Sequence, residues 1–166
     1  MITTAGLHKA IVGVWDAHGL EAVFNQYWSV VNRQEFSAFH EQEAGPSQPW
    51  PYAIFTAEPG DIITRMAGNS EHDGGYLTKD VQFSFQVFAR TFSGSGKSAK
   101  VIAAELITEI MARYGGHPTA APQDMTMDYG EVLLVQYQTD FPTREGDDEY
   151  SWTVNYMARL DVPVAL

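Results

Sequence analysis

The sequence predicts an α+β fold: a mainly antiparallel β-sheet of about four to five strands with two helices packed on one side. Two segments have the apolar three-and-four spacing of amphipathic helices. Several others alternate apolar and polar residues, as strands with one solvated face do. Because the strands have one solvated face and the helices are segregated from them, an antiparallel sheet is favoured over a parallel one. We expect residues 1–166 to form a single domain.

The first expected helix runs from Thr4 to His18. Apolar residues recur along it at helical spacing, Thr3 or Thr4 can cap its start, and Gly19 can end it. The following segment, Leu20 to Asn32, mixes helical and strand periods, so its type stays open. Residues 33–51 contain several prolines and a glycine among polar residues and are predicted to form a loop.

The middle of the chain is expected to hold strands around a long polar loop. Tyr52 to Thr56 is a short strand that a Pro-Gly turn closes, and Asp61 to Met66 extends it or pairs with it. Gly68 to Asp80 is rich in glycine and acids and is predicted to protrude. Val81 to Arg90 then alternates as a strand, with Phe88 as the one apolar residue on its polar side.

A glycine-rich stretch ending in Gly96-Lys97-Ser98 follows this strand and raises the question of a phosphate-binding loop. Thr91 stands where that motif requires its first glycine, and the preceding strand is not the continuous apolar run of a buried parallel strand. We therefore interpret the stretch as a connection in which Ser95 or Ser98 caps the next helix, Ser98 to Tyr114.

Two further strands are expected to form a long hairpin near the end of the chain. They are Glu131 to Gln138 and Ser151 to Asp161, and both alternate apolar and polar residues. The acidic segment Phe141 to Tyr150 is predicted to be the turn between them.

Composition limits the possible functions. With no cysteine there is neither a disulfide framework nor a thiolate metal site. The net charge of −11 argues against a surface that neutralises the phosphates of a nucleic acid. No apolar run approaches the length of a membrane span, and the N-terminus lacks the layout of a signal peptide, so we expect a soluble chain that is not exported and does not bind a membrane.

No catalytic, cofactor-binding or metal-binding residues are identified, and we expect no cofactor and no enzymatic activity. The histidines, which could serve as bases or ligands, are interpreted as surface, helix-end or loop residues: His8, His18, His40, His72 and His117. Asp147, Asp148 and Glu149 are interpreted as a solvated turn rather than a general acid–base pair. An exposed apolar patch among Phe88 and the less easily placed Trp28, Trp50 and Tyr52 would instead indicate a surface for a partner protein.

The order of these segments resembles that of the tail-terminator or tail-completion proteins of long-tailed bacteriophages. The segments that resemble this family are PYAIF at 51–55, VQFSFQVFA at 81–89, KSAKVIAAEL at 97–106, and the region from Leu133 through REGDDE at 144–149 to RLDVP at 159–163. The likeness covers most of residues 50–163 and includes no catalytic signature.

The resemblance implies a virion protein of the tail and neck, made in the host cytoplasm. Such proteins form a ring, hexameric in the family, at the head-proximal end of the tail tube, where they stop tube growth and offer a docking surface to the filled head. The implied partners are other copies of the chain, the tail tube protein and a head–tail connector or stopper protein. DNA is expected to pass through the channel without specific binding.

The residues that we expect at interfaces are Phe88, Arg90, His72, Asp73, Asp147, Asp148 and Glu149. A strand at a sheet edge invites pairing with a neighbour, so the strand Val81 to Arg90 or the strand Ser151 to Asp161 is the predicted subunit contact. The loops Gly68 to Asp80 and Phe141 to Tyr150 are predicted to face the head or the tail.

Two alternatives remain open on the sequence. The first is another neck component, a head–tail adaptor or stopper. The second is a small-molecule-binding or enzymatic α+β domain, which would have a closed pocket with convergent polar groups.

Overall fold

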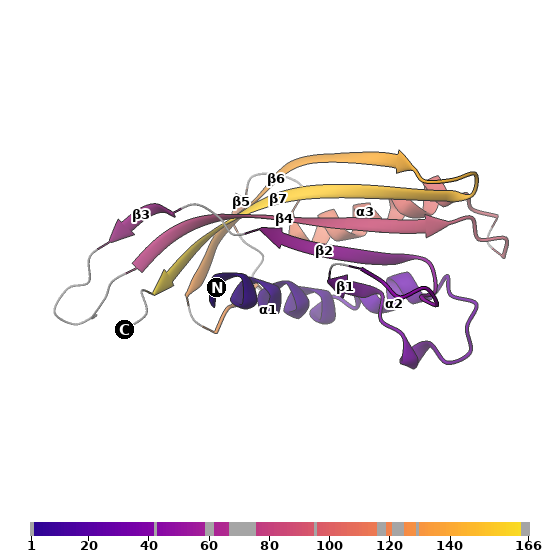
Figure 1. Cartoon of the computed structure of the whole chain (residues 1–166), viewed down its shortest axis with the longest axis horizontal. Coiled ribbons are helices and arrows are strands. Elements are labelled where there is room, and N and C mark those ends of the chain that lie inside the picture. Colours follow the sequence, from indigo (N-terminus) through magenta and orange to yellow (C-terminus); the bar gives the residue numbers. More distant parts are fainter. Residues whose placement is uncertain are drawn as a thin grey trace.

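The computed structural model describes residues 2–41, 43–58, 62–66, 76–94, 96–115, 119–120, 125–128 and 130–163. Figure 1 shows the elements, which follow the chain as α1 (Ile2–Ala17), α2 (Leu20–Asn25), a 3-10 turn (Arg33–Glu35), β1 (Phe39–Glu41), β2 (Tyr52–Glu58), β3 (Ile62–Met66), β4 (Tyr76–Arg90), α3 (Ala99–Tyr114), β5 (Thr119–Ala120), β6 (Glu131–Arg144) and β7 (Glu149–Pro163).

The strands form one sheet in the order β1-β2-β4-β7-β6-β5, and β3 pairs with the first part of β4. Every pairing described is antiparallel except that of β1 with β2. The predicted α+β class with a mainly antiparallel sheet is confirmed. The four long strands β2, β4, β7 and β6 correspond to predicted strands, and β1 and β5 are short additions at the margins. β3 corresponds to the predicted segment Asp61 to Met66, but it pairs with β4 and not with the strand Tyr52–Glu58.

The centre of the sheet is the long pairing of β4 with β7, which runs without interruption from Tyr76 opposite Pro163 to Arg90 opposite Glu149. Alternate residues of β4, from Val81 to Ala89, are buried on one face. The residues between them, such as Gln82 and Ser84, lie on the other face, which we call the outer face. The predicted alternation of this strand is therefore confirmed.

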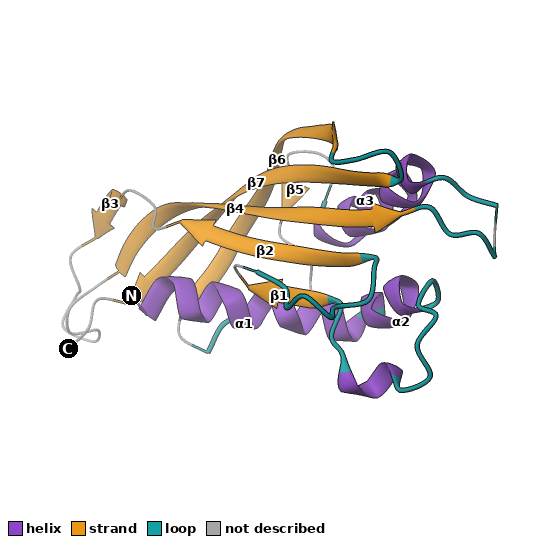
Figure 2. Ribbon diagram, turned by 45° about the vertical axis from the view of Figure 1, so that its right-hand side comes forward, coloured by secondary structure: helices purple, strands orange, loops and turns teal. Residues whose placement is uncertain are grey.

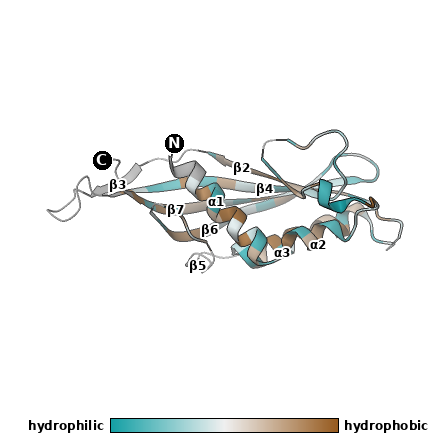
Figure 3. Cartoon of the chain, turned by 90° about the horizontal axis from the view of Figure 1, so that it is seen from below, coloured by the Kyte–Doolittle hydropathy of each residue, from teal (hydrophilic) through white to brown (hydrophobic). Residues whose placement is uncertain are grey.

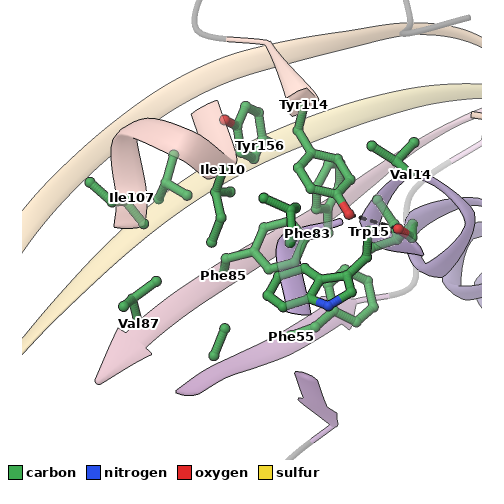
Figure 4. Packing of buried hydrophobic residues seen from close by; sticks show 14 of the residues in the cluster. Val14, Trp15, Phe55, Phe83, Phe85, Val87, Ile107, Ile110, Tyr114 and Tyr156 are labelled. Atoms are coloured by element: carbon green, nitrogen blue, oxygen red, sulfur yellow. Dashed lines mark hydrogen bonds between the residues drawn. The ribbon is translucent and has the colours of Figure 1, made fainter. Parts of the chain in front are cut away.

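The helices α1 and α3 pack on the buried face of the sheet. The ring of Phe85 lies 6.3 Å from that of Trp15 in α1 and 4.8 Å from that of Tyr114 in α3, centre to centre (Figure 4). The Tyr114 hydroxyl donates a 2.7 Å hydrogen bond to the carbonyl of Ile11 and joins the two helices. Apolar and polar residues share each of these helices (Figure 3), and their apolar stripes supply one side of the core.

The segment of open type, Leu20 to Asn32, begins with the short helix α2 and continues as an irregular loop with a turn and a bend (Figure 2). Gly19, with φ of 63°, separates α1 from α2 as predicted. Ser98 is the N-cap of α3, because its Oγ accepts from the backbone N–H of Val101. The caps proposed at Thr3 or Thr4 are wrong, because α1 already begins at Ile2.

Three predicted boundaries are corrected by the structure. β4 begins at Tyr76, so the end of the predicted loop Gly68 to Asp80 is strand, and residues 67–75 lie outside the described residues. β6 continues to Arg144, which shortens the predicted Phe141–Tyr150 turn to residues 145–148. The predicted loop 33–51 contains β1, which has too few residues to show an alternation in sequence. In each case pairing with a neighbouring strand extends regular structure into polar sequence.

Candidate protein-interaction surface

Most of the predicted interface residues gather at one end of the sheet. Phe88 and Arg90 lie at the end of β4, Glu149 begins β7, and Asp147 and Asp148 lie in the turn before it. This is the right-hand end in Figure 1, and we call it the turn end of the sheet. The other two predicted residues, at positions 72 and 73, lie outside the described residues.

Arg90 joins the aromatic and acidic parts of this end. Its guanidinium carbon lies 4.0 Å from the centre of the Trp50 ring, and its Nη2 lies 3.1 Å from Oε1 of Glu149. A guanidinium over the face of a tryptophan is attracted by the ring's quadrupole. Arg90 and Glu149 are also cross-strand neighbours, so the pairing of β4 with β7 fixes their separation.

Three aromatic side chains form a half-buried cluster beside Arg90. Tyr52 and Phe88 are cross-strand partners whose rings stack 5.2 Å apart, and the Trp50 ring lies 5.3 Å from Tyr52 and 5.9 Å from Phe88. Burial raises the pKa of the Tyr52 phenol. The predicted patch of aromatic residues therefore exists, but without Trp28, which is buried and donates from Nε1 to the carbonyl of Pro51.

The acidic turn is short and ordered by its own hydrogen bonds. Arg144 donates from Nη2 to Asp147 over 3.1 Å, and the backbone carbonyl of Asp148 accepts from the N–H of Thr91 over 3.1 Å. The hydroxyl of Ser151 donates to Glu145 over 2.7 Å. The Asp147 side chain is fully exposed, as the interpretation of a solvated turn requires.

The far part of β6 is an open edge of the sheet. On one side β6 pairs with β7 along most of its length, but on the other side it pairs with β5 only at Leu134 and Val135. From Gln136 to Arg144, the side of β6 away from β7 has no strand partner among the described residues. The prediction that β4 or β7 supplies the edge contact between subunits is wrong, because both strands are paired on two sides within the chain.

A hollow of about 240 Å³ lies beside Trp50 at the opposite edge of the sheet. Aromatic and apolar residues share its walls with polar ones: Tyr27, Val30, Pro49, Trp50, Pro51 and Phe92, together with Ser29, Arg90 and Thr91. We call it the aromatic hollow. The neighbouring side chain of Val31 is 99% exposed. Within the part of the chain that the structure describes, the backbone groups of Ser29, Val30 and Val31 have no hydrogen-bonded partner.

A wider groove of about 600 Å³ lies between α1, α2 and the 3-10 turn. The carboxylate of Glu21, in the wall of this groove, accepts hydrogen bonds from the backbone N–H of Ala38 over 2.8 Å and from Trp15 Nε1 over 3.4 Å. Glu21 therefore serves the fold, since its oxygens are directed at internal donors. The groove is open on one side, unlike the closed pocket that the small-molecule alternative predicts.

The histidines that the structure describes are dispersed. His8 in α1 contacts the Glu41 carboxylate, whereas His40, predicted to lie in a loop, belongs to β1 and packs against Tyr52. No group of three or more potential metal ligands forms among the described side chains. Among the helices of the described segments, none has the apolar length that crossing a bilayer requires.

Sequence reasoning missed the open edge and the aromatic hollow. The strand order, which decides which strand is left unpaired, has no signature in the residues of a single strand. A weak signal for the hollow existed in Trp28-Ser29-Val30-Val31, an apolar, β-branched run that does not continue the helical spacing of α2.

Comparisons with known proteins find similar solved structures but no matching family. No family model matches the chain, and no curated protein matches it in sequence. A chain described as part of the virion of a native gene transfer agent particle is similar with a TM-score of 0.43 and 18% identity. The match covers 75% of this chain and 78% of that one.

Proposed function

We propose that this chain is a non-catalytic structural protein of a tailed, phage-like particle. In this proposal copies of the chain form a ring, of six subunits, that ends the tail tube and offers the surface on which the filled head docks. The observation that carries the proposal is the open edge of β6 from Gln136 to Arg144. Unpaired N–H and C=O groups along a strand are a template for association with another chain. The sequence resemblance to tail-terminator proteins supplies the kind of assembly.

A closed ring needs two different surfaces on each subunit, because each copy contacts one neighbour with one surface and the other neighbour with another. The two edges of this sheet differ in the required way. One edge is β6, which has no strand partner beyond its short pairing with β5, and the other edge carries β1, the start of β2 and the aromatic hollow. Side-by-side packing through these edges would place successive sheets around a common axis.

The charge of the chain supports a role around DNA without binding to it. The net charge is −11, so a ring of copies repels the phosphate backbone. The middle of the outer face carries hydroxyl and amide side chains: Gln82, Ser84, Gln86, Thr153 and Asn155. A neutral, polar face of this kind could line a channel through which DNA passes without specific contacts.

The turn end of the sheet is the proposed contact with the tail tube protein or with the head–tail connector. Its aromatic cluster and the exposed Asp147 combine apolar area with charge, as the surfaces that recognise partner proteins do. The exposed acidic turn provides orientation and specificity more than affinity.

The test is the molar mass of the purified chain by light scattering across a concentration series, followed by negative-stain imaging of the heaviest species. We expect a six-fold ring with a central hole wide enough for duplex DNA. A chain that remains monomeric at every concentration, or a closed dimer, would contradict the ring. A melting temperature raised by one particular nucleotide, metal ion or metabolite would favour the small-molecule alternative instead.

A further inference from the structure

The sheet has a second open edge, opposite that of β6. β2 and β3 follow one another along the same side of β4, and β1 covers β2 only from Ala53 to Phe55. On the side away from β4, no strand of the described residues pairs with Thr56–Glu58 or with β3. We call these two stretches together the β2–β3 edge. Like the open edge of β6, it offers backbone N–H and C=O groups to another chain.

The strands at the two open edges run in opposite directions. β2 and β3 are antiparallel to β4, β4 is antiparallel to β7, and β7 is antiparallel to β6. β6 is therefore antiparallel to β2 and β3. Copies related by rotation about an axis that runs roughly along the strands would bring β6 of one copy against the β2–β3 edge of the next as an antiparallel pair, the more stable kind of pairing.

The two open edges have similar lengths but are displaced along the strands. Residues opposite one another across the sheet form a row, and each row can be named by its residue in β4. The open edge of β6 spans the rows of Gln82–Ala89, and the β2–β3 edge spans the rows of Tyr76–Ser84. From Tyr76 to Gln82, where the two edges begin, the displacement is six residues.

Two short strands act as stops that set the same displacement. β5 pairs with β6 at Leu134 and Val135, so a neighbouring edge can begin beside β6 only at Gln136. β1 occupies the space beside β2, so the β6 of another copy must end before it reaches β1. A neighbour displaced by six residues meets both conditions. Its Met66 lies beside Gln136, directly past β5, and its β1 lies directly past Arg144, the last residue of β6.

The size of the displacement agrees with the geometry of a closed sheet. Strands in a closed sheet tilt against its axis, so successive strands are displaced along their length. Each copy would contribute four strand positions: the β2–β3 edge, β4, β7 and β6. Six residues at about 3.3 Å, or roughly 20 Å, across four strands about 4.8 Å apart correspond to a tilt of about 45°. Closed barrels have tilts of about 35–45°.

The direction of the displacement decides which face of the sheet is turned toward the axis. Figure 1 views the outer face, with β4 running to the right, β6 above it and β2 below it, and the helices lie on the other side (Figure 3). Sheet twist has one hand, so the strands of a closed sheet, seen from outside, rise to the right, and each neighbour on the right is shifted upward along them. With the helices outside and β4 pointing upward, the right-hand neighbour presents its β2–β3 edge to β6 and is shifted toward the turn end, as the two stops require. With the outer face outside, the shift would have the opposite sign.

The charges along the two edges permit the contact. Thr143 would lie opposite Glu58 of the neighbour, one row from Arg144, the base of the open edge. Asp140, the other charged residue of this edge, would lie opposite an apolar position of β3. Pro142 has no N–H to donate and would fall level with the interval between β2 and β3. The open edge also lacks the lysines that commonly protect exposed edges from pairing.

We propose that β6 of one copy, from Gln136 to Arg144, pairs antiparallel with the β2–β3 edge of the next copy at a displacement of six residues, so that the outer face of the sheet faces the axis of the ring. The occupant of each edge is a second copy, because the two edges of this chain match in direction, in length and in the stops that bound them. The proposal rests on the proposed function, since it specifies the contact that repeats around the ring and the face that lines the channel.

The first test uses disulfides to measure the displacement. The chain has no cysteine, so a disulfide can join only introduced residues. Thr143 and Glu58 are exposed and would be opposite one another between copies. Opposite residues of an antiparallel pair have Cα atoms about 4.5–5.5 Å apart, within the range of about 4.4–6.8 Å for disulfides. We expect a chain with both Thr143→Cys and Glu58→Cys to give, under mild oxidation, a ladder of disulfide-linked multimers up to the size of the ring on a non-reducing gel.

The matched control combines Glu58→Cys with Gln136→Cys. These residues share a row within the chain, so they would meet between copies only if the copies packed without a displacement. We expect this chain to remain monomeric on the same gel.

The second test locates the outer face in the ring. Gln82→Cys places a thiol on the outer face, and Thr108→Cys places one on the exposed side of α3. Each variant is coupled to a maleimide gold cluster, mixed with an excess of unlabelled chain and imaged in negative stain. We expect gold on residue 82 in the central hole and gold on residue 108 at the periphery.

The outcomes separate this contact from the proposed function. If rings form and the control crosslinks while the chain with Thr143→Cys and Glu58→Cys does not, the contact is wrong and the ring stands. If the gold positions are reversed, the outer face does not line the channel, and the proposal is overturned. If the disulfide ladder forms but the unchanged chain gives open filaments without closed rings, the contact stands and the proposed function fails. If the unchanged chain does not associate and neither pair crosslinks, both are contradicted.

Discussion

At the scale of single residues, two buried tyrosines differ in whether the hydroxyl is hydrogen-bonded, and this difference predicts opposite effects on stability. Tyr114 and Tyr156 are both fully buried, but only the Tyr114 hydroxyl has an acceptor among the described residues, the Ile11 carbonyl at 2.7 Å. We expect Tyr114→Phe to lower the free energy of unfolding by about 0.5–1.5 kcal/mol, because one buried hydrogen bond is lost. We expect Tyr156→Phe to raise it by up to about 1 kcal/mol, because a buried hydroxyl without a partner is removed.

Urea unfolding followed by tryptophan fluorescence measures both changes, with the unchanged chain as reference. Both substitutions keep the aromatic ring, so only the hydroxyl is removed. The ring at position 156 still stacks 5.2 Å from Phe83, and the ring at position 114 still lies 4.8 Å from Phe85. Equal loss of stability in the two variants would show that the Tyr156 hydroxyl has a partner in solution, such as a bound water.

At the scale of elements, the start of α3 depends on two side chains that satisfy its first backbone donors. Ser98 Oγ accepts from the N–H of Val101 over 3.4 Å, and Thr91 Oγ1 accepts from the N–H of Ala99 over 3.2 Å. We expect Ser98→Ala to lower the free energy of unfolding by about 0.5–1 kcal/mol, near the lower end for cap removal because the bond is long and exposed. The measurement is the melting temperature in thermal unfolding, and the control is Ser93→Ala, at an exposed turn position in the same loop. Equal melting temperatures for the Ser98→Ala and Ser93→Ala chains would contradict a capping role for Ser98.

The elements also explain which parts of the molecule can be predicted from sequence. β4, β7 and α3 were predicted because their periodic burial leaves a pattern in the residues themselves, from Val81 to Ala89 for example. β1 has only the residues Phe39–Glu41, too few for a pattern, and it exists because β2 provides a partner. Phe88 and Arg90 were expected at a subunit contact and Glu149 in a loop facing the head or the tail, whereas the pairing of β4 with β7 brings all three to one end of the sheet.

Other parts of the candidate surface depend on tertiary arrangement and leave little trace in sequence. The aromatic hollow joins Tyr27 and Val30 to Trp50, Arg90 and Phe92, which come from three separate parts of the chain. The open edge follows from the position of β6 beyond β7, whereas the sequence-based prediction placed the edge at Val81 to Arg90 or at Ser151 to Asp161. Sequence therefore predicted the strands well and the sheet edges poorly.

At the scale of the whole molecule, charge and apolar contact act in opposite directions on assembly. Each chain carries a net charge of −11, so copies repel one another, whereas pairing along the open β6 edge, with its exposed Phe141, joins uncharged groups and depends little on salt. Added salt screens the repulsion over a Debye length that falls from about 30 Å at about 0.01 M to about 8 Å at about 0.15 M. We therefore expect the average mass of the chain to rise with sodium chloride at fixed protein concentration.

Sedimentation at about 0.02 M and about 0.3 M sodium chloride, a range over which exposed charges become screened, measures this effect. Phe141→Ser is the informative comparison, because it keeps the full charge of the chain while it removes the exposed apolar side chain of the open β6 edge. Its mass should stay near that of the monomer at both salt concentrations. If the mass of the unchanged chain falls as salt is added, ion pairs hold the copies together. The charged groups of the turn end, led by Arg90 and Asp147, would then replace the open β6 edge as the contact to be tested.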